Sequence, residues 1–370
     1  MLCLTSVASV VLSVTLQAGA PGLSDAYFYF IQGRTLEGKG DVAGALAAYK
    51  HAAELEPRSS TIHSEIAGLY ARAGKATDAI GEAETALTLD KNDREAHRIL
   101  GLVQAAVAEN YQPGARKTQT MKDAAGHLEQ ALAGSRDPGA EITLGRLDVG
   151  LGQLDKAVPV LRNFLLDNPG YPEGVMLLAE VYERTADFKS EVEILQPLYD
   201  ELHAEPASKD GGEMLRFASI SLANAYQALG QYDQTERVLR DVIQRDPKND
   251  VALNVLGYML AERGQKLDEA LTMIERALAV EPASASYLDS LGYVYLKQGK
   301  TTEAIDPLER ATKLAEGSSL LQDHLASAYF AAKRYKDAAD AWTRALAGDR
   351  EGIDIAAVTK KRDQARALIK

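Results

Sequence analysis

The apolar and small residues of this chain recur with a period close to 34 residues, which predicts repeated pairs of helices. Between the first residues of successive units, the steps are 34, 34, 44, 34, 44, 34, 35 and 34 residues. The units begin at Ala26, Ser60, Arg94, Pro138, Pro172, Arg216, Asp250, Ala285 and Ser319. A period of this length is typical of helical repeats, in which each unit buries its apolar face against its neighbours.

Two places in each unit hold small residues. The eighth place is Gly or Ala throughout, at Gly33, Ala67, Gly101, Gly145, Ala179, Ala223, Gly257, Gly292 and Ala326. Allowing for insertions, the twentieth place holds Ala45, Ala79, Ala124, Ala157, Glu191, Thr235, Ala270, Ala304 and Ala338. We interpret both places as points where the two helices of a hairpin touch, since a large side chain would hold them apart. Glu191 and Thr235 depart from this pattern.

Glycine and proline mark the ends of the predicted helices. Between the two helices of a unit stand Gly40, Gly74, Gly152, Gly230, Gly264 and Gly299, as expected where a left-handed residue ends a helix. Proline cannot continue a helix, and it follows the second helix at Pro57, Pro169, Pro247 and Pro282. With this pattern the chain resembles the tetratricopeptide-repeat (TPR) proteins from about Ala26 to Arg350. The resemblance implies an all-α fold: a right-handed superhelix of nine helix-turn-helix repeats with a concave groove.

The period also predicts how the chain is divided. Residues 26–352 form the TPR solenoid, and residues 353–370 form a polar helix that caps it. Two insertions, near residues 109–122 and 204–213, are rich in loop-forming residues and account for the two longer steps. They are expected to be surface loops, with or without a function of their own.

The first twenty residues read as a secretory signal peptide. Leu2 to Ala20 contains no charged residue, and Ala18-Gly19-Ala20 is a small-x-small cleavage pattern, although no Lys or Arg precedes the apolar run. An uncleaved membrane anchor and a disordered apolar tail are the alternatives. The leading interpretation places the protein outside the cytoplasm, in the periplasm or cell envelope, with a cytoplasmic location as the alternative.

Composition and charge exclude several classes of partner and of catalytic site. The chain has 41 Lys and Arg against 53 Asp and Glu, a net charge of −12, which argues against nucleic acid as a partner. Cys3 is alone, so no disulfide or cysteine-based metal site can form, and the six histidines are scattered. The sequence contains neither a phosphate-binding loop nor a nucleophile elbow. We therefore expect no enzyme activity, no cofactor, no metal and no small-molecule substrate, and membrane contact only if the amino-terminal segment is an anchor.

The resemblance implies a binding surface on the first helix of each unit. In units six to nine the groove positions are Asn224, Asn254, Tyr258, Asp289, Tyr293, Asp323 and Phe330. Asn254 with Tyr258, and Asp289 with Tyr293, are four residues apart, so each pair shares a helix face. Asn can hydrogen-bond an extended backbone, and Tyr offers flat contact area with a polar tip. A groove whose tyrosines only cover neighbouring helices is the alternative. We expect a protein or peptide partner with basic or hydrogen-bonding groups that meet Asp289 and Asp323.

A narrower resemblance covers about fifty residues. Asn254-Val255-Leu256-Gly257-Tyr258 and Leu288-Asp289-Ser290-Leu291-Gly292-Tyr293 are similar to segments of bacterial cell-envelope TPR proteins, some of them lipoproteins that serve as protease adaptors. Lys, Asn and Arg of the carboxylate clamp in cochaperone TPR domains are missing here. The first function hypothesis is a non-enzymatic envelope scaffold or adaptor. The alternatives are a cytosolic or membrane-tethered regulator of an enzyme and a self-assembling array.

Overall fold

The computed structural model describes residues 23–204 and 209–369, and every regular element in these ranges is an α-helix. The all-α fold expected from the sequence is confirmed. The predicted signal peptide, residues 1–20, lies outside the described residues. The chain divides into two compact units at the bond between Val181 and Tyr182.

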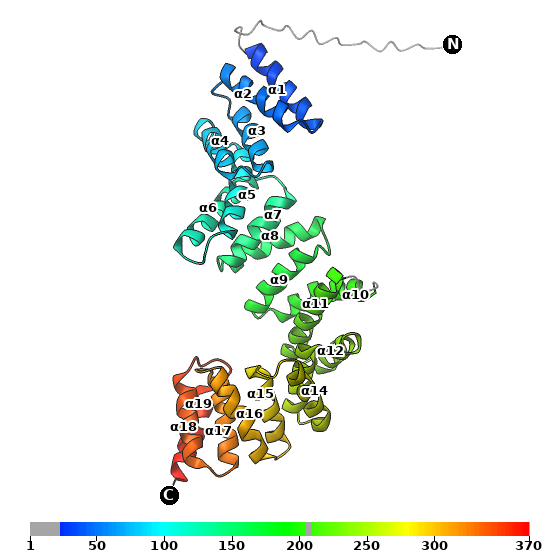
Figure 1. Ribbon diagram of the computed structural model, residues 1–370, viewed down its shortest axis with the longest axis vertical. Coiled ribbons are helices and arrows are strands. Elements are labelled where there is room, and N and C mark those ends of the chain that lie inside the picture. The colour runs from blue at the N-terminus through cyan, green and yellow to red at the C-terminus, as the bar shows by residue number, and fades with distance from the viewer. Residues whose placement is uncertain (1–22, 205–208, 370) are drawn as a thin grey trace, which may run out of the picture. The chain divides into compact units, whose positions relative to one another are not determined.

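The first unit is a stack of helical hairpins (Figure 1). Its helices are α1 (Leu23–Gly38), α2 (Val42–Leu55), α3 (Ser60–Arg72), α4 (Ala76–Leu89), α5 (Arg94–Glu109), α6 (Ala115–Ala131), α7 (Pro138–Gly150), α8 (Leu154–Asp167) and most of α9 (Pro172–Arg184). Each odd-numbered helix from α1 to α7 packs against the even-numbered helix that follows it.

The second unit continues the same construction. Its helices are α10 (Phe188–Ala204), α11 (Lys209–Ala228), α12 (Tyr232–Arg245), α13 (Asp250–Glu262), α14 (Leu267–Val280), α15 (Ala285–Lys297), α16 (Thr301–Leu314), α17 (Ser319–Ala331), α18 (Tyr335–Ala347) and α19 (Ile355–Ala367). The paired helices are α11 with α12, α13 with α14, α15 with α16 and α17 with α18. The last helix, α19, packs on α18, where Val358 and Ala365 are buried.

The helix ends follow from local chemistry. Asp93, Asp137 and Asn249 cap α5, α7 and α13, because each side chain accepts a hydrogen bond from a backbone N–H in the first turn. Glycines with positive φ stand in the turns within hairpins, for example Gly264 at 65° and Gly299 at 74°. Helices α3, α5, α7, α9, α13, α15 and α17 start at the first residues of the predicted units.

The small residues lie where hairpin helices meet. A Cβ added to Gly101 would stand 2.5 Å from Cγ of Leu128, and one added to Gly257 would stand 2.8 Å from Cγ1 of Ile274. These distances are too short for a side chain to be added without movement, which explains the glycine. The nine residues at the twentieth place are all fully buried or nearly so.

The two departures from alanine are accommodated differently. The Thr235 hydroxyl donates to the Ala223 carbonyl at 3.2 Å, so its polar group is satisfied inside the seam. Glu191 is only 1% exposed, and its Oε2 has no hydrogen-bond partner. Burial, followed by the charge of Glu183, raises the pKa of Glu191 to about 7.

Where the structure describes them, the two insertions are mostly helical, which corrects the expectation of surface loops. In the first, only residues 110–114 separate α5 from α6, and the remaining residues lengthen α6 at its start. In the second, residues up to Ala204 continue α10 and residues from Lys209 begin α11. The loop-forming composition was misleading because glycines such as Gly212 are accommodated in the longer helix.

Candidate functional site

Helices α13, α15 and α17 carry a row of stacked rings. The rings of Tyr258 and Tyr293 are stacked, with centroids 5.1 Å apart and an interplanar angle of 28°. The ring of His324 continues the row, with its centroid 4.8 Å from that of Tyr293. We call Tyr258, Tyr293 and His324 the aromatic row. The two tyrosines were predicted as site residues and the structure brings them together. His324 was missed, although it directly follows the predicted Asp323.

Asp289 contacts this row through His324 and is not a free carboxylate. It is 4% exposed, and both of its carboxylate oxygens are 2.9 Å from Nδ1 of His324. The expectation that Asp289 meets a basic group of a partner is therefore corrected, because a side chain of the next hairpin already occupies it.

Asp323 and Phe330 contact the carboxyl-terminal helices α18 and α19. Asp323 accepts a hydrogen bond from Nε1 of Trp342 at 2.6 Å, and both of its oxygens are 3.0 Å from Nζ of Lys361 on α19. Phe330 packs against Tyr335 and Trp342, with ring centroids 5.4 and 5.6 Å away. The chain itself thus supplies the basic group that was expected to come from a partner at Asp323.

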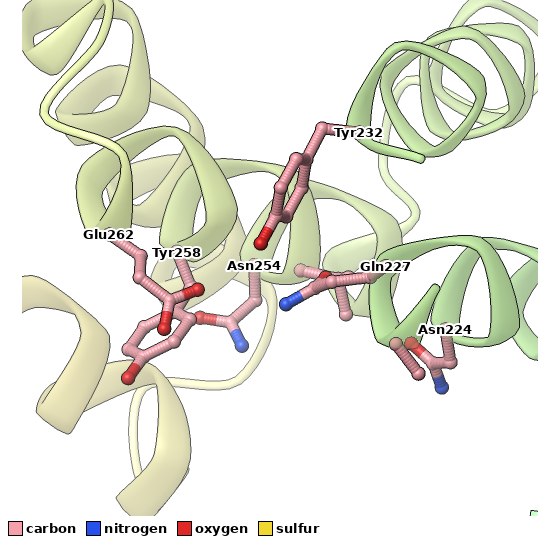
Figure 2. Close-up of a pocket in the computed structure, with 8 residues that line it drawn as sticks. Asn224, Gln227, Tyr232, Asn254, Tyr258 and Glu262 are labelled. Atoms are coloured by element: carbon pink, nitrogen blue, oxygen red, sulfur yellow. The ribbon is translucent and has the colours of Figure 1, made fainter. Parts of the chain in front are cut away.

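Asn224, Asn254 and Tyr258 line one pocket, so the structure brings these three predicted residues together. Its volume is about 510 Å³. We call it the amide pocket, and its lining is Asn224, Gln227, Ala228, Tyr232, Asn254, Val255, Tyr258 and Glu262. Figure 2 shows the side chains of Gln227 and Tyr232, from α11 and α12, pointing toward the face of α13 that carries Asn254, Tyr258 and Glu262.

Sequence reasoning missed three polar residues of this pocket. Gln227 occupies the twelfth place of its unit, and Glu262 follows Tyr258 by one helical turn, so the register could have found both. Tyr232 begins the second helix of its hairpin, where the repeat pattern predicts no contact with the groove.

The pocket combines enclosed and exposed polar groups. Oδ1 of Asn254 is buried and has no hydrogen-bond partner, whereas Asn224 and Glu262 are exposed. Burial, followed by the charges of Tyr293, Asp289 and Glu262, raises the pKa of Tyr258. Its phenol therefore remains protonated at neutral pH and can donate a hydrogen bond.

In residues 23–204 and 209–369, no group of three or more His, Cys, Asp or Glu is placed to hold a metal ion. Within the same ranges, no helix is both long and apolar enough to cross a membrane.

Two family models match the chain. The model described as "Tetratricopeptide repeat" matches residues 30–94, 142–202 and 220–266. The model described as "Anaphase-promoting complex, cyclosome, subunit 3" matches residues 263–345.

Curated relatives match over part of their length. The chain is 30% identical to the TPR repeat-containing protein PA4667 of Pseudomonas aeruginosa, over 53% of this chain and 32% of that protein. It is 26% identical to the beta-barrel assembly-enhancing protease of Escherichia coli K12, over 51% of this chain and 37% of that protein. It is 24% identical to the BBSome complex member BBS4 homolog of Drosophila melanogaster, over 85% of this chain and 56% of that protein. The chain thus spans about a third to just over half of these relatives.

Among solved structures, a chain of the APC/C hetero-tetramer Cut9-Hcn1 aligns with a TM-score of 0.48 and 10% identity, over 92% of this chain and 90% of that one. The repeat register, the hairpins and the family-model matches agree with one another. The chain is a tetratricopeptide-repeat protein.

Proposed function

We propose that the chain is a non-enzymatic scaffold that binds a segment of another protein along the aromatic row and the amide pocket. TPR solenoids generally serve to bind other proteins through their stacked hairpins. The observation that carries the proposal is the amide pocket beside two stacked tyrosines, all presented by consecutive hairpins of one compact unit.

The chemistry of this surface suits a peptide segment. The amides of Asn224 and Gln227 can both donate to and accept from a peptide backbone. The rings of Tyr258 and Tyr293 are partly exposed and offer flat apolar area with a polar tip. Because helices hold these side chains and the rings already stack, little order has to be gained on binding, which favours affinity.

A double substitution tests the proposal. Peptides selected by display on the whole chain should bind the Tyr258→Ala/Tyr293→Ala variant more weakly by about 2–4 kcal/mol, the range of aromatic hot spots. The measurement is fluorescence anisotropy with a labelled peptide, with circular dichroism as the check on folding. The matched control is Tyr27→Ala/Tyr171→Ala, which removes two exposed tyrosines of the first unit, 66% and 45% exposed. Equal affinity of the parent and the Tyr258/Tyr293 variant for every selected peptide would refute the proposed surface.

The proposed setting is the bacterial cell envelope. It is supported by the charge-free segment Leu2–Ala20, by its Ala18-Gly19-Ala20 cleavage pattern and by the similarity to bacterial proteins. A fusion of residues 1–25 to a reporter active only outside the cytoplasm should be active in a bacterial host. Reporter activity confined to the cytoplasm would instead favour the cytosolic regulator.

A further inference from the structure

Helices α13, α15 and α17 each carry a hydrogen-bond acceptor at the same place of the repeat, and two of the three have a basic partner within the chain. The fifth place of each unit holds Asn254, Asp289 or Asp323. A basic side chain from the next part of the chain occupies each aspartate: His324 on Asp289 and Lys361 on Asp323. Both aspartates thus show that a basic side chain can bind at this place of the repeat.

Asn254 has no such occupant. The residue of α15 that corresponds to His324 in the register is Ser290, whose hydroxyl donates to the backbone carbonyl of Ser286 at 3.0 Å. Oδ1 of Asn254 is accordingly left without a donor, although it is buried. A buried acceptor without a donor is destabilising, because it has lost its hydrogen bonds to water and gained none in return. Asn254 lines the amide pocket, so a donor bound in the pocket would lie beside this amide.

Glu262 brings a negative charge to the same pocket. Glu262 lies two turns after Asn254 on α13 and lines the amide pocket, and among the described residues its carboxylate has no ion-pair partner. Two cations lie nearby, and Lys297 donates a hydrogen bond to the backbone carbonyl of Glu262 at 3.4 Å. Lys297 lies over the ring of Tyr293 at 5.1 Å, and Arg263 lies over the ring of Tyr232 at 4.6 Å, outside the lining of the pocket.

We propose that the amide pocket receives a cationic side chain, an arginine or a lysine, of the bound segment. The inference rests on the proposed function and names the partner chemistry of the same site. Glu262 pairs with the charge, and the amide oxygens of Asn254 and Gln227 accept its N–H groups. The ring of Tyr258 provides a face on which a cation is stabilised. A ligand carboxylate is disfavoured, because the lining holds one acid and no base.

The test compares a charged fragment with its neutral isostere. N-acetyl-arginine amide and N-acetyl-citrulline amide have nearly the same shape, but only the first is charged. Each is titrated into the isotopically labelled full chain, and the side-chain amide and tyrosine ring signals are followed by NMR. We expect the arginine compound to bind about fivefold more tightly than the citrulline compound, the ratio that an exposed ion pair of about 1 kcal/mol gives.

Charge-removing variants assign this preference to the pocket. Glu262→Gln should reduce it to less than about twofold, because the paired charge is gone. Glu275→Gln is the matched control, since it removes an exposed acidic charge from α14 outside the pocket and should leave the preference unchanged.

The outcomes separate this inference from the proposed function. Equal binding of the two compounds, or binding of neither, overturns the cationic pocket. So does an arginine preference that survives in Glu262→Gln. Each of these results is compatible with display peptides that still depend on Tyr258 and Tyr293, and only the loss of that dependence overturns the surface itself.

Discussion

At the scale of single residues, the closest constraint is the contact between the two helices of a hairpin. Gly257 on α13 faces Ile274 on α14, and a Cβ at Gly257 would also stand 3.1 Å from the Ala270 carbonyl oxygen. The carbonyl belongs to the backbone and cannot turn away as a side chain can. Space at Gly257 is therefore limited by the backbone of α14 as well as by the Ile274 side chain.

A large residue at this place should destabilise the second unit. We expect Gly257→Leu to lower the free energy of unfolding by about 1–3 kcal/mol or more, because the added atoms force α13 away from α14. Urea denaturation of the full chain measures the effect. Gly81→Leu is the control, since Gly81 is an exposed helical glycine whose added Cβ would meet nothing within 4 Å. A parent-like midpoint for Gly257→Leu would show that the seam is misassigned.

The buried carboxyl of Glu191 gives a pH prediction whose sign is fixed. Burial raises the pKa of Glu191 from 4.5 in the ordinary case to about 7 in the folded chain. The folded state thus binds this proton more tightly than the unfolded state does. The contribution of this proton to folding stability is therefore complete below pH 4.5 and is lost as the pH rises through about 7. Relative to Glu191→Gln, the parent should lose about 3 kcal/mol of stability across that window, at 1.36 kcal/mol per pH unit.

Denaturation of both proteins at several pH values between 4.5 and 8 checks the difference. Glu201→Gln serves as the control, because Glu201 is an exposed residue of the same helix, α10. A difference between the parent and Glu191→Gln that does not change with pH would contradict the prediction.

At the scale of elements, α19 is held mainly by apolar contacts. Val358 is 1% exposed and belongs to a cluster with Trp342 and Ala365. The Lys361 side chain that pairs with Asp323 is 42% exposed, so solvent screens this ion pair. Helix α19 therefore stabilises the carboxyl-terminal end of the second unit more through its buried apolar side chains than through the ion pair of Lys361 with Asp323.

Two substitutions in α19 should have unequal effects. We expect Val358→Ala to lower the free energy of unfolding by about 1–2 kcal/mol, since it removes two buried methyl groups. Lys361→Ala should cost less than about 1 kcal/mol, the usual limit for an exposed pair. Fluorescence of Trp342 in urea reports on both, because this residue is the only tryptophan in the sequence. A larger loss of unfolding free energy for Lys361→Ala than for Val358→Ala would show that the ion pair, and not apolar burial, holds α19.

The register of the elements could be predicted from the sequence, but the pairing of polar side chains could not. Small residues at fixed places and glycines in the turns are enough to locate the hairpins, because these features depend on backbone contacts. Asp289 reads as a groove residue from its place alone. Only the structure shows that His324 reaches it from the next hairpin and that Tyr232 enters the amide pocket from a second helix. Those contacts depend on side-chain length and direction, which one repeat pattern does not specify.

At the scale of the whole molecule, the chain consists of two compact units whose hairpins contact mainly their neighbours. In such an array, stability is close to a sum of terms for each repeat and for each interface between adjacent repeats. The interfaces here are unequal. The seam of α10 carries the buried Glu191, whereas the seams of α14, α16 and α18 carry Ala270, Ala304 and Ala338.

Unequal interfaces predict that the chain does not unfold in one step. Far-ultraviolet circular dichroism reports on the helices of both units, whereas Trp342 fluorescence reports on α17 to α19, with which the indole is in contact. We expect the two urea transitions to have different midpoints, because a repeat array whose neighbouring terms differ loses its cooperativity where the coupling is weakest. Val358→Ala, which weakens only the tryptophan end, should move the fluorescence midpoint more than the dichroism midpoint. Coincident transitions in the parent, moved equally by this variant, would show instead that the two units unfold as one.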